Sequence, residues 1–268
     1  MNHINDKFPI ITEELIKINN KCTGCGACEN ICPADAITLK YDESGFLKPL
    51  IEQAKCVHCN RCVSVCPTLK ENDSEAKLKK ASWRLAEPDC YAAWAEDDIR
   101  LQSSSGGVFT VAAKAVLKEK GWVYGAAWED GFVCSHKGIN ETGKLAQLQY
   151  SKYIQSETGK CYREVKEHLK AGEYVLYAGR PCQIAGLRSY LGELAQKDNL
   201  IMMDLLCFYT PSAHYFRKYL DENYGIQNMK EVLFRNKKRG WSSNAYTLIK
   251  KDGEEIYPNP KEDAFLSM

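Results

Sequence analysis

The sequence predicts an α+β unit built around cysteines, followed by an α/β domain with a mixed, largely parallel sheet. Eight of the 13 cysteines fall in two runs within the first 70 residues. Residues 71–89 are rich in charge and poor in regular apolar spacing, which is typical of a connector. From Cys90 onward, short strand-like runs alternate with helical periods. We therefore expect domains at 1–70 and 90–268, joined by a linker at 71–89.

Both cysteine runs have the spacing C-x-x-C-x-x-C-x-x-x-C-P. In such a run three thiolates hold one [4Fe-4S] cube, and the fourth cysteine, followed by proline, reaches the other cube. The expected ligands are Cys22, Cys25, Cys28 and Cys66 for the first cluster, and Cys56, Cys59, Cys62 and Cys32 for the second. Because each cluster takes one ligand from the other run, neither half is expected to fold or load metal alone. The first domain is therefore predicted to be ferredoxin-like.

Other uses of these cysteines fit the pattern less well. Zinc stays an alternative, although a structural zinc site requires neither the third cysteine of each run nor the Cys-Pro ending. A disulfide framework is typical of small secreted domains, and this chain opens without a basic flank that leads into an apolar run. His58 is expected to face solvent, because four thiolates complete each cube. We expect a soluble protein in a reducing cytoplasm.

Charge and hydropathy exclude further classes. The net charge of +1 gives no reason to expect a nucleic-acid partner. The longest apolar stretch, residues 200–209, contains Asp204 and is well short of the ~20 residues that a membrane span requires. No Ser-His-Asp set is readable, so hydrolysis is not supported and no catalytic residue is assigned.

The second domain is expected to alternate between strands and helices. Strands are predicted at 90–95, 122–128, 174–178 and 200–206, and helices at 106–120, 158–171, 183–191 and 211–224. In such sheets, ligands bind at the carboxyl ends of the strands.

Two loops that lead into predicted helices are candidates for ligand binding. Residues 103–107, Ser-Ser-Ser-Gly-Gly, place hydroxyls and glycines at a helix start, where free N–H groups and the helix dipole favour an anion. The alternative is a serine cap, with glycines that relieve crowding. Residues 178–183, Ala-Gly-Arg-Pro-Cys-Gln, form a glycine turn with proline at the helix entrance. An ordinary strand-to-helix turn is the alternative there.

The order of these blocks resembles that of the coenzyme F420 hydrogenase/dehydrogenase beta subunit family. After the cysteine runs come Ser-Ser-Ser-Gly-Gly-Val-Phe at 103–109, Tyr-Ser-Lys-Tyr-Ile-Gln-Ser at 150–156, Ala-Gly-Arg-Pro-Cys-Gln-Ile-Ala-Gly-Leu at 178–187, Asp-Leu-Leu-Cys at 204–207 and Pro-Ser at 211–212. The resemblance implies two [4Fe-4S] clusters and FAD. It also implies flavin contacts at Ser104, Ser105, Gly106, Gly107, Lys152, Tyr153, Ser156, Gly179, Pro181, Cys182 and Gln183.

The function implied by the resemblance is electron transfer between the clusters and a two-electron carrier such as coenzyme F420. A cube changes by one electron and cannot exchange hydride, so a flavin would couple the two. The expected partners are a redox protein or subunit and a small-molecule hydride carrier. Two alternatives stay open, namely a plain two-cluster electron carrier and an electron-transfer subunit of a larger hydrogenase, dehydrogenase or reductase.

Three further expectations concern the rest of the chain. Similar family members run on to more cysteines, so we expect a truncated chain. Most cysteines outside the two runs, namely Cys90, Cys134, Cys161, Cys182 and Cys207, are expected to pack as small hydrophobes, with Cys182 and Cys207 as candidates for the flavin face or a further cluster. The basic run at 234–241 is expected to be a solvated turn, with a surface that faces an acidic coenzyme as the alternative.

Overall fold

The computed structural model of this protein describes residues 21–70, 89–240, 246–259, 263 and 265. Its helices are α2 (Ala27–Ile31), α3 (Arg61–Val65), α4 (Pro67–Lys70), α7 (Asp97–Arg100), α8 (Val108–Lys118), α9 (Cys161–Lys170), α10 (Pro181–Leu191) and α11 (Ala213–Tyr224). Its strands are β1 (Ile37–Tyr41), β2 (Leu47–Ile51), β3 (Trp122–Glu129), β4 (Val133–Ile139), β5 (Val175–Gly179), β6 (Leu200–Asp204), β7 (Met229–Leu233), β8 (Thr247–Lys250) and β9 (Glu255–Ile256). Short 3-10 helices are η1 (Gln53–Lys55), η2 (Asp130–Phe132), η3 (Thr142–Gln147), η4 (Gly192–Gln196) and η5 (Ile226–Asn228).

The N-terminal unit consists of two cysteine turns and a hairpin. Helices α2 and α3 each follow one turn, and β1 pairs with β2 in antiparallel register, with Ile37 opposite Ile51. The core between the helices and the hairpin contains Ala36 and these two isoleucines. Six of the eight cysteines of the two runs belong to this core or pack against it. A core so rich in thiols is small. The helices and the hairpin together confirm the predicted α+β, ferredoxin-like unit.

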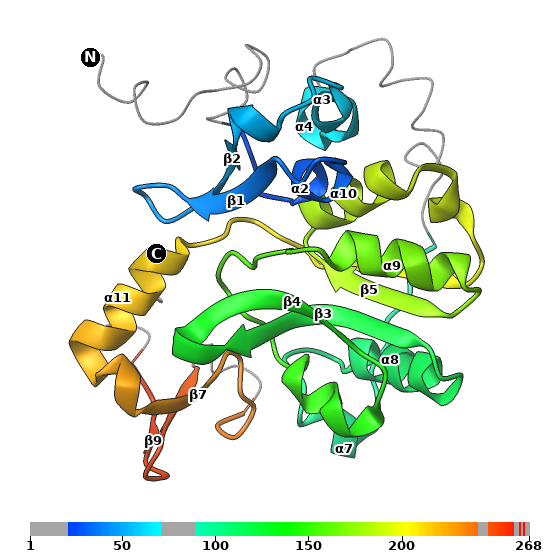
Figure 1. Ribbon diagram of the computed structural model, residues 1–268. Coiled ribbons are helices and arrows are strands. Elements are labelled where there is room, and N and C mark those ends of the chain that lie inside the picture. The colour runs from blue at the N-terminus through cyan, green and yellow to red at the C-terminus, as the bar shows by residue number, and fades with distance from the viewer. Residues whose placement is uncertain (1–20, 71–88, 241–245, 260–262, 264, 266–268) are drawn as a thin grey trace.

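The larger unit is built on a four-stranded sheet with the order β4-β3-β5-β6. Strands β3, β5 and β6 run parallel, and β4 returns antiparallel to β3. Helices α9 and α10 cover one face of the sheet, and α8 covers the other (Figure 1). Tyr124 and Tyr177 belong to the buried cluster that includes α9 and α10, whereas Val123 and Leu176 belong to the one that includes α8. The predicted α/β domain with a mixed, largely parallel sheet is therefore confirmed.

A second, antiparallel sheet follows in the chain. Its order is β7-β8-β9, and α11 packs against it through a core rich in aromatic rings. Phe216 of α11, Phe234 and Tyr246 are all fully buried there. No strands were predicted after residue 224, so this sheet is an addition to the expected architecture.

The predicted elements of the larger unit are confirmed within a few residues, with one exception. The strand predicted at 90–95 is wrong, because residues 89–96 have no regular secondary structure. Tyr91 and Trp94, which supplied its apolar pattern, are 84% and 72% exposed. The backbone N–H of Ala95 donates to the carbonyl of Gly106 at 2.7 Å, so this stretch packs against the entrance of α8.

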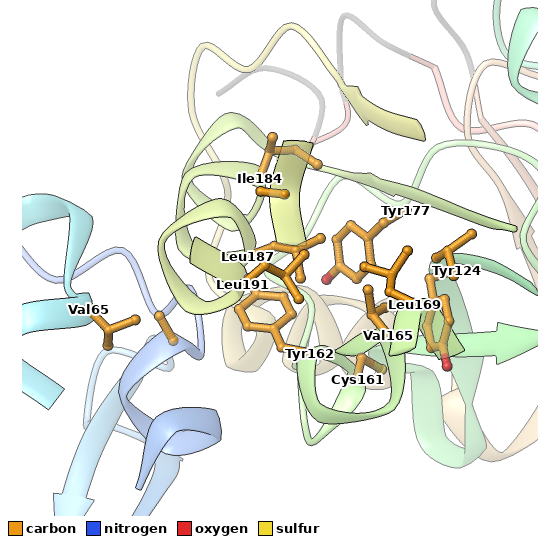
Figure 2. Close-up of a cluster of buried hydrophobic side chains, with 13 residues drawn as sticks. Val65, Tyr124, Cys161, Tyr162, Val165, Leu169, Tyr177, Ile184, Leu187 and Leu191 are labelled. Carbon is orange, nitrogen blue, oxygen red and sulfur yellow. The ribbon is translucent and has the colours of Figure 1, made fainter. Parts of the chain in front are cut away.

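The two units share a hydrophobic core. Ala27 of α2 and Val65 of α3 belong to the same buried cluster as side chains of α9, β5 and α10 (Figure 2). In Figure 1, the blue and cyan N-terminal elements lie against α10. The division into domains at 1–70 and 90–268 stays a prediction, since residues 71–88 of the expected linker lie outside the described residues. In the described part of the chain, no helix has the length and apolar character that crossing a membrane requires.

Arg163 of α9 holds the two units together by binding the backbone of the first cysteine turn. Its Nε donates to the carbonyl of Asn30 at 2.7 Å, and its Nη2 donates to the carbonyl of Cys32 at 2.7 Å. Nη2 also pairs with the Asp35 carboxylate at 2.8 Å. Asn30 Nδ2 in turn donates to the carbonyl of Gly159 at 2.7 Å. Each of the two units therefore donates hydrogen bonds to backbone carbonyls of the other.

Candidate redox site

The four cysteines predicted to hold the second cluster line one hollow. They are Cys32, Cys56, Cys59 and Cys62. Cys32 comes from the first run and is buried, whereas Cys59 is exposed. Two residues of the turn, His58 and Asn60, adopt left-handed backbone conformations, with φ values of 50° and 54°. This end of the N-terminal unit faces solvent, and His58 is exposed, as the sequence predicts.

The cysteines predicted for the first cluster are more deeply enclosed. Burial raises the pKa of the Cys25 thiol to about 12 and raises that of Cys28 well above its usual value. The thiol of Cys66, from the second run, raises the pKa of Cys22, Cys25 and Cys28 as well, so it lies near them. Thiols in such surroundings ionise when bound iron supplies the compensating charge.

The described cysteines do not converge on the position of a single metal ion. Among residues 21–70, 89–240 and the shorter described stretches, no three His, Cys, Asp or Glu side chains are placed to hold a single metal ion. A cube spreads its four thiolates over four irons rather than drawing them to one point. The ligand assignment to two cubes stays a prediction.

Glycines let the first cysteine turn approach the larger unit. Gly24 and Gly26 have φ values of 65° and 83°, which disfavour any side chain. A Cβ on Gly26 would lie 2.7 Å from Cβ of Thr158, and one on Gly24 would lie 2.6 Å from Nε2 of Gln155. Conformation and space therefore both require glycine here.

Helix α10 passes directly beside Cys25. A Cβ on Gly186 of α10 would lie 3.1 Å from the Cys25 Sγ. The Tyr162 hydroxyl lies 2.7 Å from the carbonyl oxygens of both Cys25 and Gln183. Thr158 Oγ1 donates to the same Cys25 carbonyl at 3.2 Å. The first cluster position is thus the inner one, held against the larger unit.

A recess of about 360 Å³ adjoins this inner cluster position, and it is called the recess from here on. It is lined by Cys22, Thr23, Phe46, Lys48, Gln155, Arg180, Pro181, Cys182, Cys207 and Thr210. Residues 180–182 follow β5 and begin α10, and residues 207 and 210 follow β6. The recess therefore lies at the carboxyl ends of two parallel strands, where the sequence predicts ligands to gather. Cys22 brings the first cluster position to its wall.

Three predicted flavin contacts lie behind this wall, in a buried polar network. Gln183 Nε2 donates to Ser156 Oγ at 3.0 Å, and Ser156 Oγ lies 3.2 Å from His136 Nδ1. His136 Nε2 donates to the carbonyl of Ala178 at 3.1 Å, which leaves Nδ1 as the acceptor. A Cβ on Gly179 would lie 3.3 Å from the His136 ring. Ser156, Gly179 and Gln183 thus support the recess from inside, whereas Pro181 and Cys182 line it.

The pH dependence of stability is expected to show the burial of His136. Burial, reinforced by the charges of Arg180 and Lys152, lowers its pKa from 6.5 to about 4. Between these values the unfolded chain binds the extra proton, so stability is complete above pH 6.5 and falls as the pH drops towards 4. We expect a loss of roughly 3 kcal/mol from this group. The measurement is the unfolding free energy of the wild type and of His136→Asn from pH 4 to 7, and equal pH slopes would contradict it.

The serine loop, residues 103–107, is fixed by other parts of the chain. Ser104 Oγ donates to the carbonyl of Phe234 at 3.2 Å and accepts from the backbone N–H of Ser151 at 2.8 Å. Ser105 is exposed. Gly107, with φ 87°, precedes α8, and a Cβ on Gly106 would lie 2.7 Å from the Ala93 carbonyl oxygen. Packing therefore gives both glycines a reason to be there, whether or not a phosphate binds.

The two lysines near this loop are engaged by backbone carbonyls. Lys237 Nζ donates to the carbonyls of Arg100, Ser103 and Ser105 at 2.5–2.6 Å. The expectation of a solvated turn at 234–241 is therefore wrong for Lys237 and for Phe234, which is buried; residue 241 lies outside the described residues. Lys152 Nζ donates to the carbonyls of Gln147 and Gln149, and burial lowers its pKa to about 8.

The predicted flavin contacts thus form two groups, joined by one segment. Ser151 contacts the serine loop, and Gln155, four residues later, lines the recess. Four residues span at most roughly 13 Å when they are fully extended. Tyr153 lies between them, 42% exposed and with its ring edge-on to Phe234. Lys48 and Phe46 of the hairpin, which also line the recess, carry no motif and were not predicted.

The comparisons with known proteins match two parts of the chain. Residues 21–69 match the 4Fe-4S dicluster domain, and residues 172–256 match the family described as the C terminus of the coenzyme F420 hydrogenase/dehydrogenase beta subunit. Residues 70–171, which include the serine loop, lie outside both matches. No curated protein matches the chain.

Among the solved structures that are similar in part is a chain from a xenon-derivatised F420-reducing [NiFe] hydrogenase complex of Methanosarcina barkeri, with 14% identity and a TM-score of 0.45. The similarity covers 63% of this chain and 59% of that one. The two family matches confirm the resemblance drawn from the order of the sequence blocks. The chain therefore combines a region similar to a 4Fe-4S dicluster domain with a region similar to the C terminus of the coenzyme F420 hydrogenase/dehydrogenase beta subunit.

Proposed function

We propose that this protein is an iron-sulfur flavoprotein oxidoreductase, in which electrons pass between an outer cluster, an inner cluster and a flavin in the recess. The observation that carries the proposal is the position of Cys22, an expected ligand of the inner cluster, in the wall of the recess. Cys59, an expected ligand of the outer cluster, is exposed, whereas Cys25 and Cys28 are enclosed. This order gives a one-electron partner access at one end and a small molecule access at the other.

The residues present fit a flavin. The recess is of the size that ligand pockets commonly have and combines the apolar surfaces of Phe46 and Pro181 with the cations Lys48 and Arg180. Residues 151–155 connect the serine loop to the recess and span at most roughly 13 Å, which an elongated dinucleotide can bridge. Ser104, Ser105, Gly106 and Gly107 would hold its phosphates. When bound, FAD exchanges single electrons with clusters and electron pairs with a hydride carrier.

The substrate that we propose is a two-electron carrier of the deazaflavin type, such as coenzyme F420. Support comes from the family match over residues 172–256, which contain Arg180, Cys182, Cys207 and Thr210 of the recess. The family description names a beta subunit, so we also propose that the chain works beside a redox partner protein or subunit. Iron-sulfur assembly in the cytoplasm would load its clusters.

A second candidate function is electron transfer without a flavin, as a carrier or subunit. The exposed turn at the outer cluster favours it equally, because a partner protein can approach Cys59 directly. Under this alternative the recess would be a surface feature without a redox group.

The test is purification without oxygen, followed by analysis of iron, sulfide and extractable flavin. The proposed function requires about eight irons and about one FAD per chain, and flavin absorbance that falls upon addition of reduced coenzyme F420 or NADH. Full cluster content without flavin, and no uptake of added FAD, would leave the electron carrier as the function.

A further inference from the structure

Two of the cations near the segments that the resemblance assigns to flavin are occupied by backbone carbonyls. Lys152 donates to the carbonyls of Gln147 and Gln149, and Lys237 donates to the backbone of the serine loop and of Arg100. Arg180 differs from both. Its Nη2 is buried and has no hydrogen-bond partner among the described residues. A buried guanidinium nitrogen without a partner is costly, and negative charge bound nearby would offset that cost.

The rest of the Arg180 side chain is held in place by protein groups. Nη1 donates to Thr210 Oγ1 at 3.0 Å, and Nε lies 3.4 Å from Gln183 Oε1. The same Gln183 oxygen accepts from the Arg180 backbone N–H at 3.1 Å, while its amide nitrogen donates to Ser156. The guanidinium is therefore oriented before any ligand arrives, and a ligand in the recess would meet its positive charge.

The surroundings of Arg180 favour a negatively charged redox group over a phosphate. Arg180 lines the recess together with Lys48, and it directly precedes α10, whose positive dipole end adds to their charge. Cys22, in the same wall, brings the inner cluster position close. A phosphate next to a cube would exchange no electrons, whereas a flavin ring that gains negative charge on reduction would do so and be stabilised by the cation.

We propose that Arg180 places its positive charge beside the reduced flavin ring and thereby raises the reduction potential of the flavin, with Gln183 and Thr210 as positioning residues. This inference rests on the proposed function. Lys152, which the resemblance implies as a flavin contact, is not assigned this role, because its ammonium is already bound by two carbonyls. A positive charge near the ring favours the reduced state over the oxidised one.

The test is an anaerobic redox titration of the bound flavin in the wild type and in four variants of the full chain. Arg180→Gln removes the charge, and Arg180→Lys keeps it. Thr210→Asp leaves Arg180 and the start of α10 intact but places a carboxylate beside Nη1, which neutralises the guanidinium. The matched control is Lys218→Gln, which removes an exposed cation from α11, outside the recess lining.

We expect Arg180→Gln and Thr210→Asp each to weaken the preference for reduced flavin at least tenfold, which is about 30 mV for a two-electron couple. Arg180→Lys should retain most of the preference, and Lys218→Gln should leave it unchanged. Iron, sulfide and flavin contents show whether each variant has folded. If Arg180→Gln loses its clusters, the flavin potential of Thr210→Asp tests the role of Arg180. An unchanged potential in a flavin-loaded Thr210→Asp or Arg180→Gln variant overturns the role of Arg180, whereas a wild type without flavin overturns the proposed function itself.

Discussion

Replacing Cys66 by serine is expected to remove the inner cluster, although Cys66 lies in the second cysteine run. The Cys66 thiol raises the pKa of Cys22, Cys25 and Cys28, which places it with the first run. Its loss leaves three thiolates for the inner cube, so iron should fall from about eight to about four atoms per chain. Because ligation and folding are coupled, the thermal stability of the N-terminal unit should fall as well.

The matched variant is Cys32→Ser, which concerns the outer cluster. Cys32 belongs to the first run but lines the hollow with Cys56, Cys59 and Cys62. Electron paramagnetic resonance of the two reduced variants should show different residual clusters, and only Cys66→Ser should slow electron exchange between cluster and flavin. Identical residual spectra, or unchanged iron in either variant, would contradict the crossed ligand assignment.

Replacing Arg163 by methionine is expected to cost about 3 kcal/mol of unfolding free energy. Methionine keeps most of the aliphatic bulk but leaves the carbonyls of Asn30 and Cys32 without the guanidinium that binds them at 2.7 Å. These carbonyls belong to the first cysteine turn. The measurement is anaerobic urea unfolding, followed in parallel by cluster absorbance and by circular dichroism.

The control for Arg163 is Lys160→Met, on the same helix boundary. Lys160 pairs with Asp35 at 3.0 Å, but both side chains are largely exposed, so this ion pair should contribute far less. Cluster absorbance should be lost at lower urea in Arg163→Met than in Lys160→Met. Coincident unfolding curves for the two variants would mean that Arg163 does not join the units.

The parts of the structure that the sequence predicts best are those with local signals. Cysteine spacing is one, because C-x-x-C-x-x-C turns act within a dozen residues. The alternation of strands and helices from Trp122 to Tyr224 is another, because hydrophobic periodicity within each element reports the face that it buries. The predicted helix at 158–171 begins at Cys161 and differs only by its first turn.

The parts that could not be predicted depend on contacts between distant segments. Lys237 binds carbonyls more than 130 residues away, and nothing in its basic neighbours distinguishes it from a solvated lysine. Lys48 reaches the recess from the hairpin in the same way. The strand predicted at 90–95 failed for the opposite reason, since Tyr91 and Trp94 have a strand-like pattern but bury neither ring.

The apolar surface shared by Val65, Ala27 and α10 means that oxidative damage to the iron would not stay local. If air oxidises a cube and the iron is lost, the short helices around it lose their cysteine ligation to the cluster. Apolar side chains that are now buried, such as Leu187 and Tyr162, would then become exposed. Uncovered surface of this kind is what degradative proteases and chaperones recognise. A chain that has lost its metal would thereby be marked for disposal rather than persist as an inactive competitor for its partners.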